Sequence, residues 1–142
     1  MPDPSLEERR RRVATFDFRH LHPHLRMGTA SDRYAGWIGQ IYPESYRTRI
    51  RSRKKRLGKE TFEERVLPVD SVHHYFQHFD VLELDFTFYR PLREADGTPT
   101  NNLFALEQYA EHAPAEARFL LKAPQAFFTP VLRRSRDGRP HY

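Results

Sequence analysis

The chain has 142 residues, of which 38% are hydrophobic and 13% aromatic, so it can bury the core of a single domain. It contains no cysteine, which excludes disulfides, thiol catalysis and thiolate zinc sites. The formal net charge is +5, but residues 47–59 alone hold eight of the 24 Lys and Arg and no acid, so the positive charge is local. No apolar run approaches the ~18 residues that a membrane span needs, and we expect no membrane contact and a cytoplasmic location.

The first quarter of the chain predicts a polar segment followed by one strand. Residues 1–24 are polar and interrupted by proline, and we treat 25–142 as the folded domain. The apolar run 25–31, ending in glycine and small polar residues, predicts a strand that opens into a loop. Residues 32–43, rich in aromatic residues and glycine, predict a long ordered loop.

The middle of the chain predicts a basic loop and then helical structure. The basic run 47–59 is interpreted as a solvated loop. Thr61 and Glu64 have the spacing of a capping box, which predicts a helix start that Pro68 interrupts. An apolar stripe at i, i+3, i+7 and i+10 over 69–79 then predicts an amphipathic helix.

Residues 81–91 predict a strand with one apolar and one polar face. The even positions are apolar, and the odd positions carry Val81, Glu83, Asp85, Thr87 and Tyr89. This period of two is typical of a strand. Asn102 then predicts the N-cap of a helix that follows it, and the run that begins at Arg118 predicts a third strand, which ends at Lys122 before Pro124.

The order strand, helix, strand, helix, strand predicts a parallel α/β fold. Each connection exceeds the dozen or so residues of a parallel crossover, so we expect a βαβαβ chain. A strand with a polar inner face fits a barrel, whose active sites lie at the carboxyl ends of its strands.

Three blocks, "GTASDRYAGWIGQIYP", "FDVLELDFTFYRP" and "RFLLKAP", resemble in order and spacing the first three strand regions of the YecE-like family (domain of unknown function 72). The resemblance implies the first three units of a TIM-type barrel, with a ligand site at its mouth. The chain departs from the family pattern at Ser31 and Asp32, and its basic run is longer than the family leads us to expect.

The candidate catalytic residues are Glu83, Asp85 and Lys122. An ammonium group beside two carboxylates keeps all three ionised and can orient an oxygenated substrate. The alternative is a structural ion pair. The mouth site that the resemblance implies gives as candidate ligand-binding residues Thr29, Tyr34, Trp37, Thr87, Tyr89 and Arg90. The aromatic rings could stack on a sugar or a base, or could simply pack.

These residues favour, for the complete protein, an enzyme that acts on a small polar or anionic ligand whose identity and cofactors the sequence does not name. The alternative is a protein that binds phosphate or nucleic acid through its basic loop, which we favour less because no aromatic residue interrupts 47–59. The alternating His20, His22 and His24 precede the first strand, and we predict no metal site from them.

Since a TIM-type barrel needs eight strands and about 250 residues, we expect this chain to be an inactive fragment of one. Its first and third strands would leave unpaired edges, so we also expect self-association through these edges.

Overall fold

The computed structural model describes residues 5–15, 17–128, 134–136 and 139–141. Its centre is a parallel sheet of three strands in the order β1 (Gly28–Thr29), β4 (Val81–Leu84) and β5 (Arg118–Leu121). Gly28 pairs with Val81, and Glu83 pairs with Leu120. A Cβ atom at Gly28 would lie 1.9 Å from the carbonyl oxygen of Val81, so only glycine allows β1 to approach β4 this closely.

The predicted fold class, a parallel βαβαβ chain forming the first units of a TIM-type barrel, is wrong. The protein is a mixed α/β domain. Along the chain, an antiparallel hairpin of β2 (Arg51–Leu57) and β3 (Glu60–Val66) comes between β1 and β4, and it forms a separate sheet of two strands. The predicted basic loop 47–59 is wrong from residue 51 on, because 51–57 form β2, and the predicted helix start at Thr61 is wrong because Thr61 lies in β3. Gly58 has φ +62° at the first position of the two-residue turn, where hairpins of this kind need glycine.

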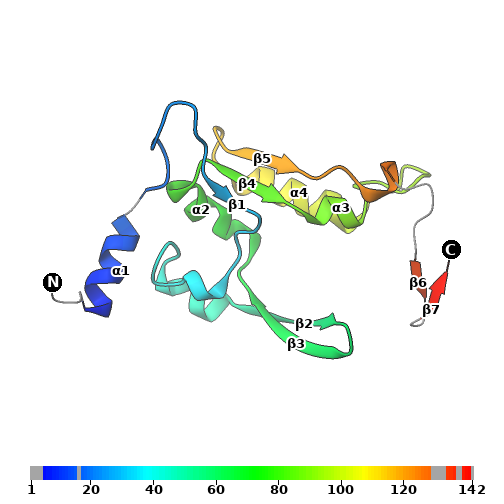
Figure 1. Ribbon diagram of the computed structural model, residues 1–142, viewed down its shortest axis with the longest axis horizontal. Coiled ribbons are helices and arrows are strands. Elements are labelled where there is room, and N and C mark those ends of the chain that lie inside the picture. The colour runs from blue at the N-terminus through cyan, green and yellow to red at the C-terminus, as the bar shows by residue number, and fades with distance from the viewer. Residues whose placement is uncertain (1–4, 16, 129–133, 137–138, 142) are drawn as a thin grey trace.

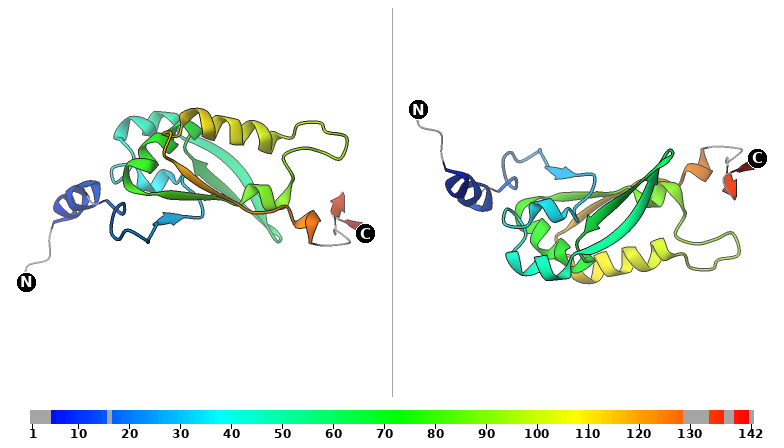
Figure 2. Two further views of the ribbon diagram at one scale, coloured as in Figure 1. Left: turned by 90° about the horizontal axis from the view of Figure 1, so that it is seen from above. Right: turned by 90° about the horizontal axis from the view of Figure 1, so that it is seen from below.

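Helices cover one face of the parallel sheet (Figures 1 and 2). These are α2 (Val72–His78), preceded by the 3-10 turn η3 (Val69–Ser71), and α4 (Asn101–His112). Leu82 and Leu84 point toward the helices and are buried, and the ring of Phe119 makes edge contacts with Phe76 and Tyr109. On the opposite face Leu120 is 57% exposed, so the described part of the chain leaves that face open.

The second predicted strand is shorter than expected. β4 ends at Leu84, and the chain turns into α3 (Phe86–Tyr89). The side-chain amide of Asn102 donates to the carbonyl oxygens of Phe86 (2.9 Å) and Arg90 (2.7 Å), so it serves this turn. The N-cap of α4 is Thr100, whose hydroxyl accepts from the backbone N–H of Asn102, and the predicted cap at Asn102 is wrong.

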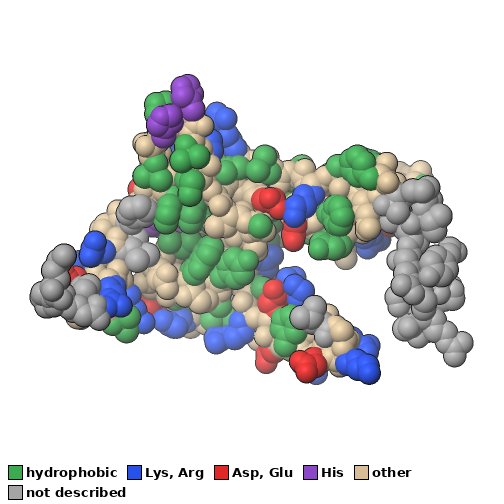
Figure 3. All heavy atoms as spheres, viewed as in Figure 1, with side chains coloured by type: hydrophobic (Ala, Val, Ile, Leu, Met, Phe, Trp, Pro, Cys, Tyr) green, Lys and Arg blue, Asp and Glu red, His purple; other side chains and the backbone are tan. Residues whose placement is uncertain are grey.

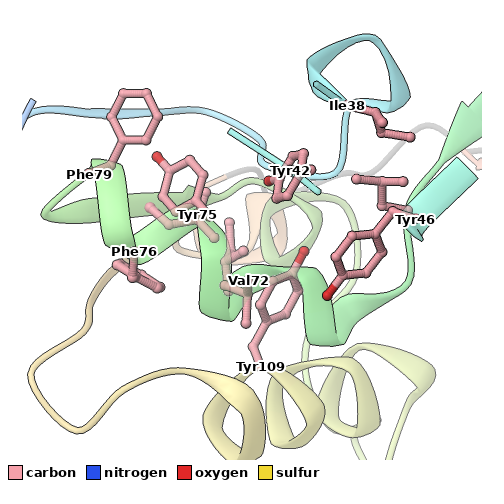
Figure 4. Packing of buried hydrophobic residues seen from close by; sticks show 11 residues of the cluster. Ile38, Tyr42, Tyr46, Val72, Tyr75, Phe76, Phe79 and Tyr109 are labelled. Carbon is pink, nitrogen blue, oxygen red and sulfur yellow. The ribbon is translucent and has the colours of Figure 1, made fainter. Parts of the chain in front are cut away.

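The core is unusually rich in tyrosine (Figure 4). It draws on the segment after β1, on α2, on β4 and on α4, and consists of Ile38, Tyr42, Tyr46, Leu67, Val72, Tyr75, Phe76, Phe79, Leu82, Leu84 and Tyr109. Tyrosine needs a hydrogen-bond partner when its hydroxyl is buried. The hydroxyl groups of Tyr42, Tyr75 and Tyr109 accordingly form hydrogen bonds that join different parts of the core.

Six elements remain among the described residues, and two of them contribute to the core, because Tyr46 is one of its members and Ala35 and Trp37 pack against it. The six are α1 (Leu6–Thr15), β6 (Arg134–Arg136), β7 (Arg139–His141) and three 3-10 turns, η1 (Ala35–Trp37), η2 (Glu44–Arg49) and η4 (Gln125–Phe127). Within the described ranges, each helix is too short or too polar to cross a lipid bilayer.

Candidate ligand-binding site

The carboxyl ends of the three parallel strands lie at one edge of the sheet. β1 ends at Thr29, β4 at Leu84 and β5 at Leu121. Ligands of open α/β sheets bind outside this edge, where the following loops begin. The sequence-predicted site residues all lie on or just after these strand ends, but the structure divides them between different surroundings.

Glu83 and Lys122 form a salt bridge at this edge. The Nζ of Lys122, directly after β5, lies 2.7 Å from an Oε1 of Glu83 on β4, so the predicted contact between neighbouring parallel strands is confirmed. Both side chains keep access to solvent, with 46% and 30% of their surface exposed. The hydrogen bond from Lys122 to Glu83 raises the pKa of Lys122, and the charge of Asp85 adds to the rise. Lys122 therefore stays protonated: its ammonium group can donate a hydrogen bond to an oxygen atom of a ligand, but it cannot act as a neutral amine nucleophile.

Thr87, Tyr89 and Arg90 line a hollow of about 1130 Å³, which Lys122 lines as well. Thr87 is buried in α3, and its hydroxyl lies 2.7 Å from the carbonyl oxygen of Lys122, to which it donates. Tyr89 is 76% exposed, and Arg90 is paired with Glu94 at 2.5 Å. Thr87 is therefore occupied in joining α3 to the end of β5.

Thr29, Tyr34 and Trp37 line a different hollow, of about 960 Å³, at the end of β1. Three arginines line it as well, Arg10 of α1, Arg47 of η2 and Arg65 of β3, and we call it the arginine hollow. An antiparallel bridge between Tyr34 and Val66 brings the aromatic segment against the base of the hairpin, which places Arg65 beside the rings. The rings of Tyr34 and Trp37 meet edge to face, with centroids 4.8 Å apart.

The charges of the arginine hollow are only partly balanced. Arg47 is hydrogen-bonded to Glu44, which lowers the pKa of Glu44. The charge of Arg10 also lowers the pKa of Glu44, but neither Arg10 nor Arg65 forms a salt bridge with an acid among the residues that the structure describes. These arginines could not be predicted from the sequence as a group, because they come from three separate elements and Arg65 reaches the hollow only through the hairpin.

Asp32 is the second feature that the sequence did not single out as functional. It is 1% exposed, its Oδ1 accepts a hydrogen bond from the Tyr109 hydroxyl at 2.8 Å, and its Oδ2 has no partner among the described residues. Burial raises the pKa of Asp32 to about 6, against the opposing effect of the Tyr109 hydrogen bond. Tyr42 donates to the backbone carbonyl oxygen of the same residue at 2.5 Å.

No group of three or more His, Cys, Asp or Glu side chains lies close enough to hold a metal ion within the part of the chain that the structure describes. The rings of His22 and His24 are tilted against each other, with centroids 5.6 Å apart, in an exposed loop.

Comparison with models of known protein families, with curated proteins and with solved structures gives no match to this chain. The YecE-like resemblance stays a prediction, and the site has to be interpreted from its own geometry.

Proposed function

We propose that this protein binds a small anionic ligand, bearing a phosphate or carboxylate group, in the arginine hollow. The observation that carries the proposal is that three arginines from separate elements, Arg10, Arg47 and Arg65, line one hollow at the carboxyl end of a parallel strand, where Glu44 offsets only part of their charge. Like charges brought together repel one another unless an anion offsets them. Guanidinium groups suit this task, because their donors match the oxygen atoms of phosphate and carboxylate.

The aromatic wall adds a preference for a ligand that carries a ring. Tyr34 is 47% exposed and Trp37 is half-buried, and both line the hollow beside the arginines. An accessible ring face can stack on a base or pack against the apolar side of a sugar. A nucleotide or a sugar phosphate offers both the ring and the anion. A cytoplasmic location is part of the proposal, since charged esters of this kind do not cross bilayers readily.

Binding, rather than catalysis, is the proposed activity. Lys122 lines the other hollow, and Glu83 lies beside it, so these two candidate catalytic residues are not on the wall of the arginine hollow. The predicted catalytic role of Glu83, Asp85 and Lys122 stays a prediction of its own.

The single tryptophan makes the test specific, because Trp37 is the only one in the chain and it lines the hollow. Inorganic phosphate, pyrophosphate and AMP are titrated separately while tryptophan fluorescence is recorded. We expect a saturable change for at least one of the three. We expect Arg65→Gln to weaken that binding at least about tenfold, as for the loss of a hydrogen bond between charged groups.

The matched control is Arg118→Gln, which removes the same charge from the exposed amino end of β5, away from the hollow. It should leave the dissociation constant unchanged. Sodium chloride at equal ionic strength provides the second control. A signal that follows ionic strength alone, or an equal effect of the two variants, would overturn the proposal.

A further inference from the structure

The hairpin of β2 and β3, residues 51–66, projects from the body of the protein (Figures 1 and 2). We call it the basic hairpin. The side chains described from 51 to 63 are all exposed, and only Glu64 and Val66 near its base are half-buried. A two-stranded hairpin without a covering layer is at best marginally stable in water. Because these side chains are exposed, both faces of the basic hairpin are accessible to a binding partner.

The basic hairpin also carries most of the net charge of the protein. It contains seven Lys and Arg against three Glu, a net charge of +4, whereas the whole chain has +5. Figure 3 shows these charged side chains on an arm that stands apart from the sheet. The rest of the chain is close to neutral, so any attraction to a polyanion is concentrated on this arm.

The two faces of the basic hairpin differ. On one face Arg53 and Lys55 share Glu64, at 2.6 Å and 3.6 Å, and these bonds lower the pKa of Glu64. The strand register places a different set on the other face, namely Ser52, Lys54, Arg56, Thr61, Glu63 and Arg65. That face is wholly polar. Its three cations make no ion pair within the described residues, although Glu63 lies opposite Lys54.

We propose that the basic hairpin binds double-stranded DNA through this polar face, with Lys54 and Arg56 contacting phosphates. The major groove of B-DNA, about 12 Å wide, admits a two-stranded ribbon, whereas the major groove of double-stranded RNA is too narrow for one. Seven residues per strand give the ribbon a length of roughly 23 Å. Unpaired cations gain from releasing the counterions of DNA.

An anionic membrane is the less favoured partner. Surface binding to lipid needs apolar side chains that insert beside the charges. Among the side chains that the structure describes in the basic hairpin, Phe62 is the one exposed large hydrophobic residue, and it lies on the face of Arg53 and Lys55. The proposed DNA-binding face has none.

The test measures binding of a fluorescent 20-base-pair duplex by anisotropy over a range of salt concentrations. We expect the double variant Lys54→Gln and Arg56→Gln to bind at least tenfold more weakly at 0.1 M salt. Its slope of log K against log salt should be shallower by about 2, since each lost phosphate contact removes about 0.9. Neither residue lines the arginine hollow, so phosphate or AMP binding there should be unaffected.

The matched control replaces Arg11 and Arg12 by Gln, which removes the same charge from exposed positions of α1. It should keep the full affinity for DNA. A third variant, Glu63→Gln, removes the acid opposite Lys54 and should tighten binding. Its opposite sign keeps the test decisive even if the double variant loses structure.

Three results would overturn the proposal. The first is no binding of the duplex, and the second is an equal loss in the hairpin and α1 variants. The third is a preference, dependent on Lys54 and Arg56, for vesicles containing phosphatidylserine, for single-stranded DNA or for double-stranded RNA.

Discussion

Tyr109 donates a hydrogen bond from its phenol to Oδ1 of Asp32, 2.8 Å away in the interior of the protein. The contact joins α4 to the segment after β1, which are 77 positions apart in the chain. Burial, and after it the negative charge of Asp32, raises the pKa of Tyr109, so the phenol stays protonated and remains a donor. Asp32 is then a buried acid with one satisfied oxygen atom and one without a described partner.

Asp32→Asn is expected to change how stability depends on pH. Because the folded-state pKa is raised to about 6 from 3.8, the folded protein holds a proton between these values that the unfolded chain has lost. The free energy of unfolding therefore falls as pH rises through this window. Asn does not titrate, so the variant lacks this decline. Its free energy of unfolding, relative to that of the parent, should therefore rise between pH 4 and pH 7 by on the order of 3 kcal/mol. Urea denaturation at both pH values measures it.

Tyr109→Phe is the companion variant for this site. It removes the hydrogen bond that lowers the pKa of Asp32, so the decline of stability should extend to higher pH and become larger in total than in the parent protein. Parallel stability curves for the parent and Asp32→Asn would show that Asp32 does not titrate as argued.

Tyr75→Phe is expected to destabilise the protein. The Tyr75 hydroxyl donates to the carbonyl oxygen of Val81 at 2.9 Å and accepts from the backbone N–H of Thr29 at 2.8 Å, so it ties α2 to two strands. Its side chain is fully buried. Losing these bonds should cost about 1–3 kcal/mol in the free energy of unfolding, measured with urea. Tyr34→Phe, at an exposed hydroxyl, is the control, and equal effects would contradict the assignment.

Glu83→Gln tests the salt bridge at the sheet edge. Because the bond to Glu83 is the main cause of the raised pKa of Lys122, the variant should lower that pKa toward its ordinary value. The melting temperature should barely change, since the pair is accessible to solvent. NMR titration of the Lys122 side chain gives the measurement. Glu94→Gln, which breaks the Arg90 pair, should leave Lys122 unaffected, and an unchanged Lys122 in the Glu83 variant would refute the coupling.

The central strand of the parallel sheet could be predicted from the sequence because β4 has a buried face. Leu82 and Leu84 alternate with half-buried residues, and the stripe over 69–79 contains α2 and its leading turn. The meeting of Glu83 and Lys122 followed from placing neighbouring strands side by side. These features depend on periodicity and chain order, which the sequence displays directly.

The basic hairpin could not be predicted in this way. A strand exposed on both faces has no apolar alternation, so β2 looked like a charged loop and Thr61 with Glu64 looked like a helix start. The period of two also continued past Leu84, although the chain turns there. The hydrogen bonds of Asn102 and Thr87 that stabilise the turn come from long-range contacts.

The arginine hollow was missed for the same reason. Thr29, Tyr34 and Trp37 were singled out from their place after a strand, but Arg65 joins them only because β3 returns to the Tyr34 segment. A site assembled by an unpredicted hairpin has no continuous sequence motif.

The hairpin has one more property, which follows from its register. The chain leaves the body at Arg51 and re-enters it at Val66, and these two residues are paired neighbours. No described residue of the basic hairpin belongs to the central core. Pairs of opposed residues can therefore be inserted or deleted near Gly58 without moving Ile50 or Leu67. The length of the arm is thus free to vary independently of the domain that carries it.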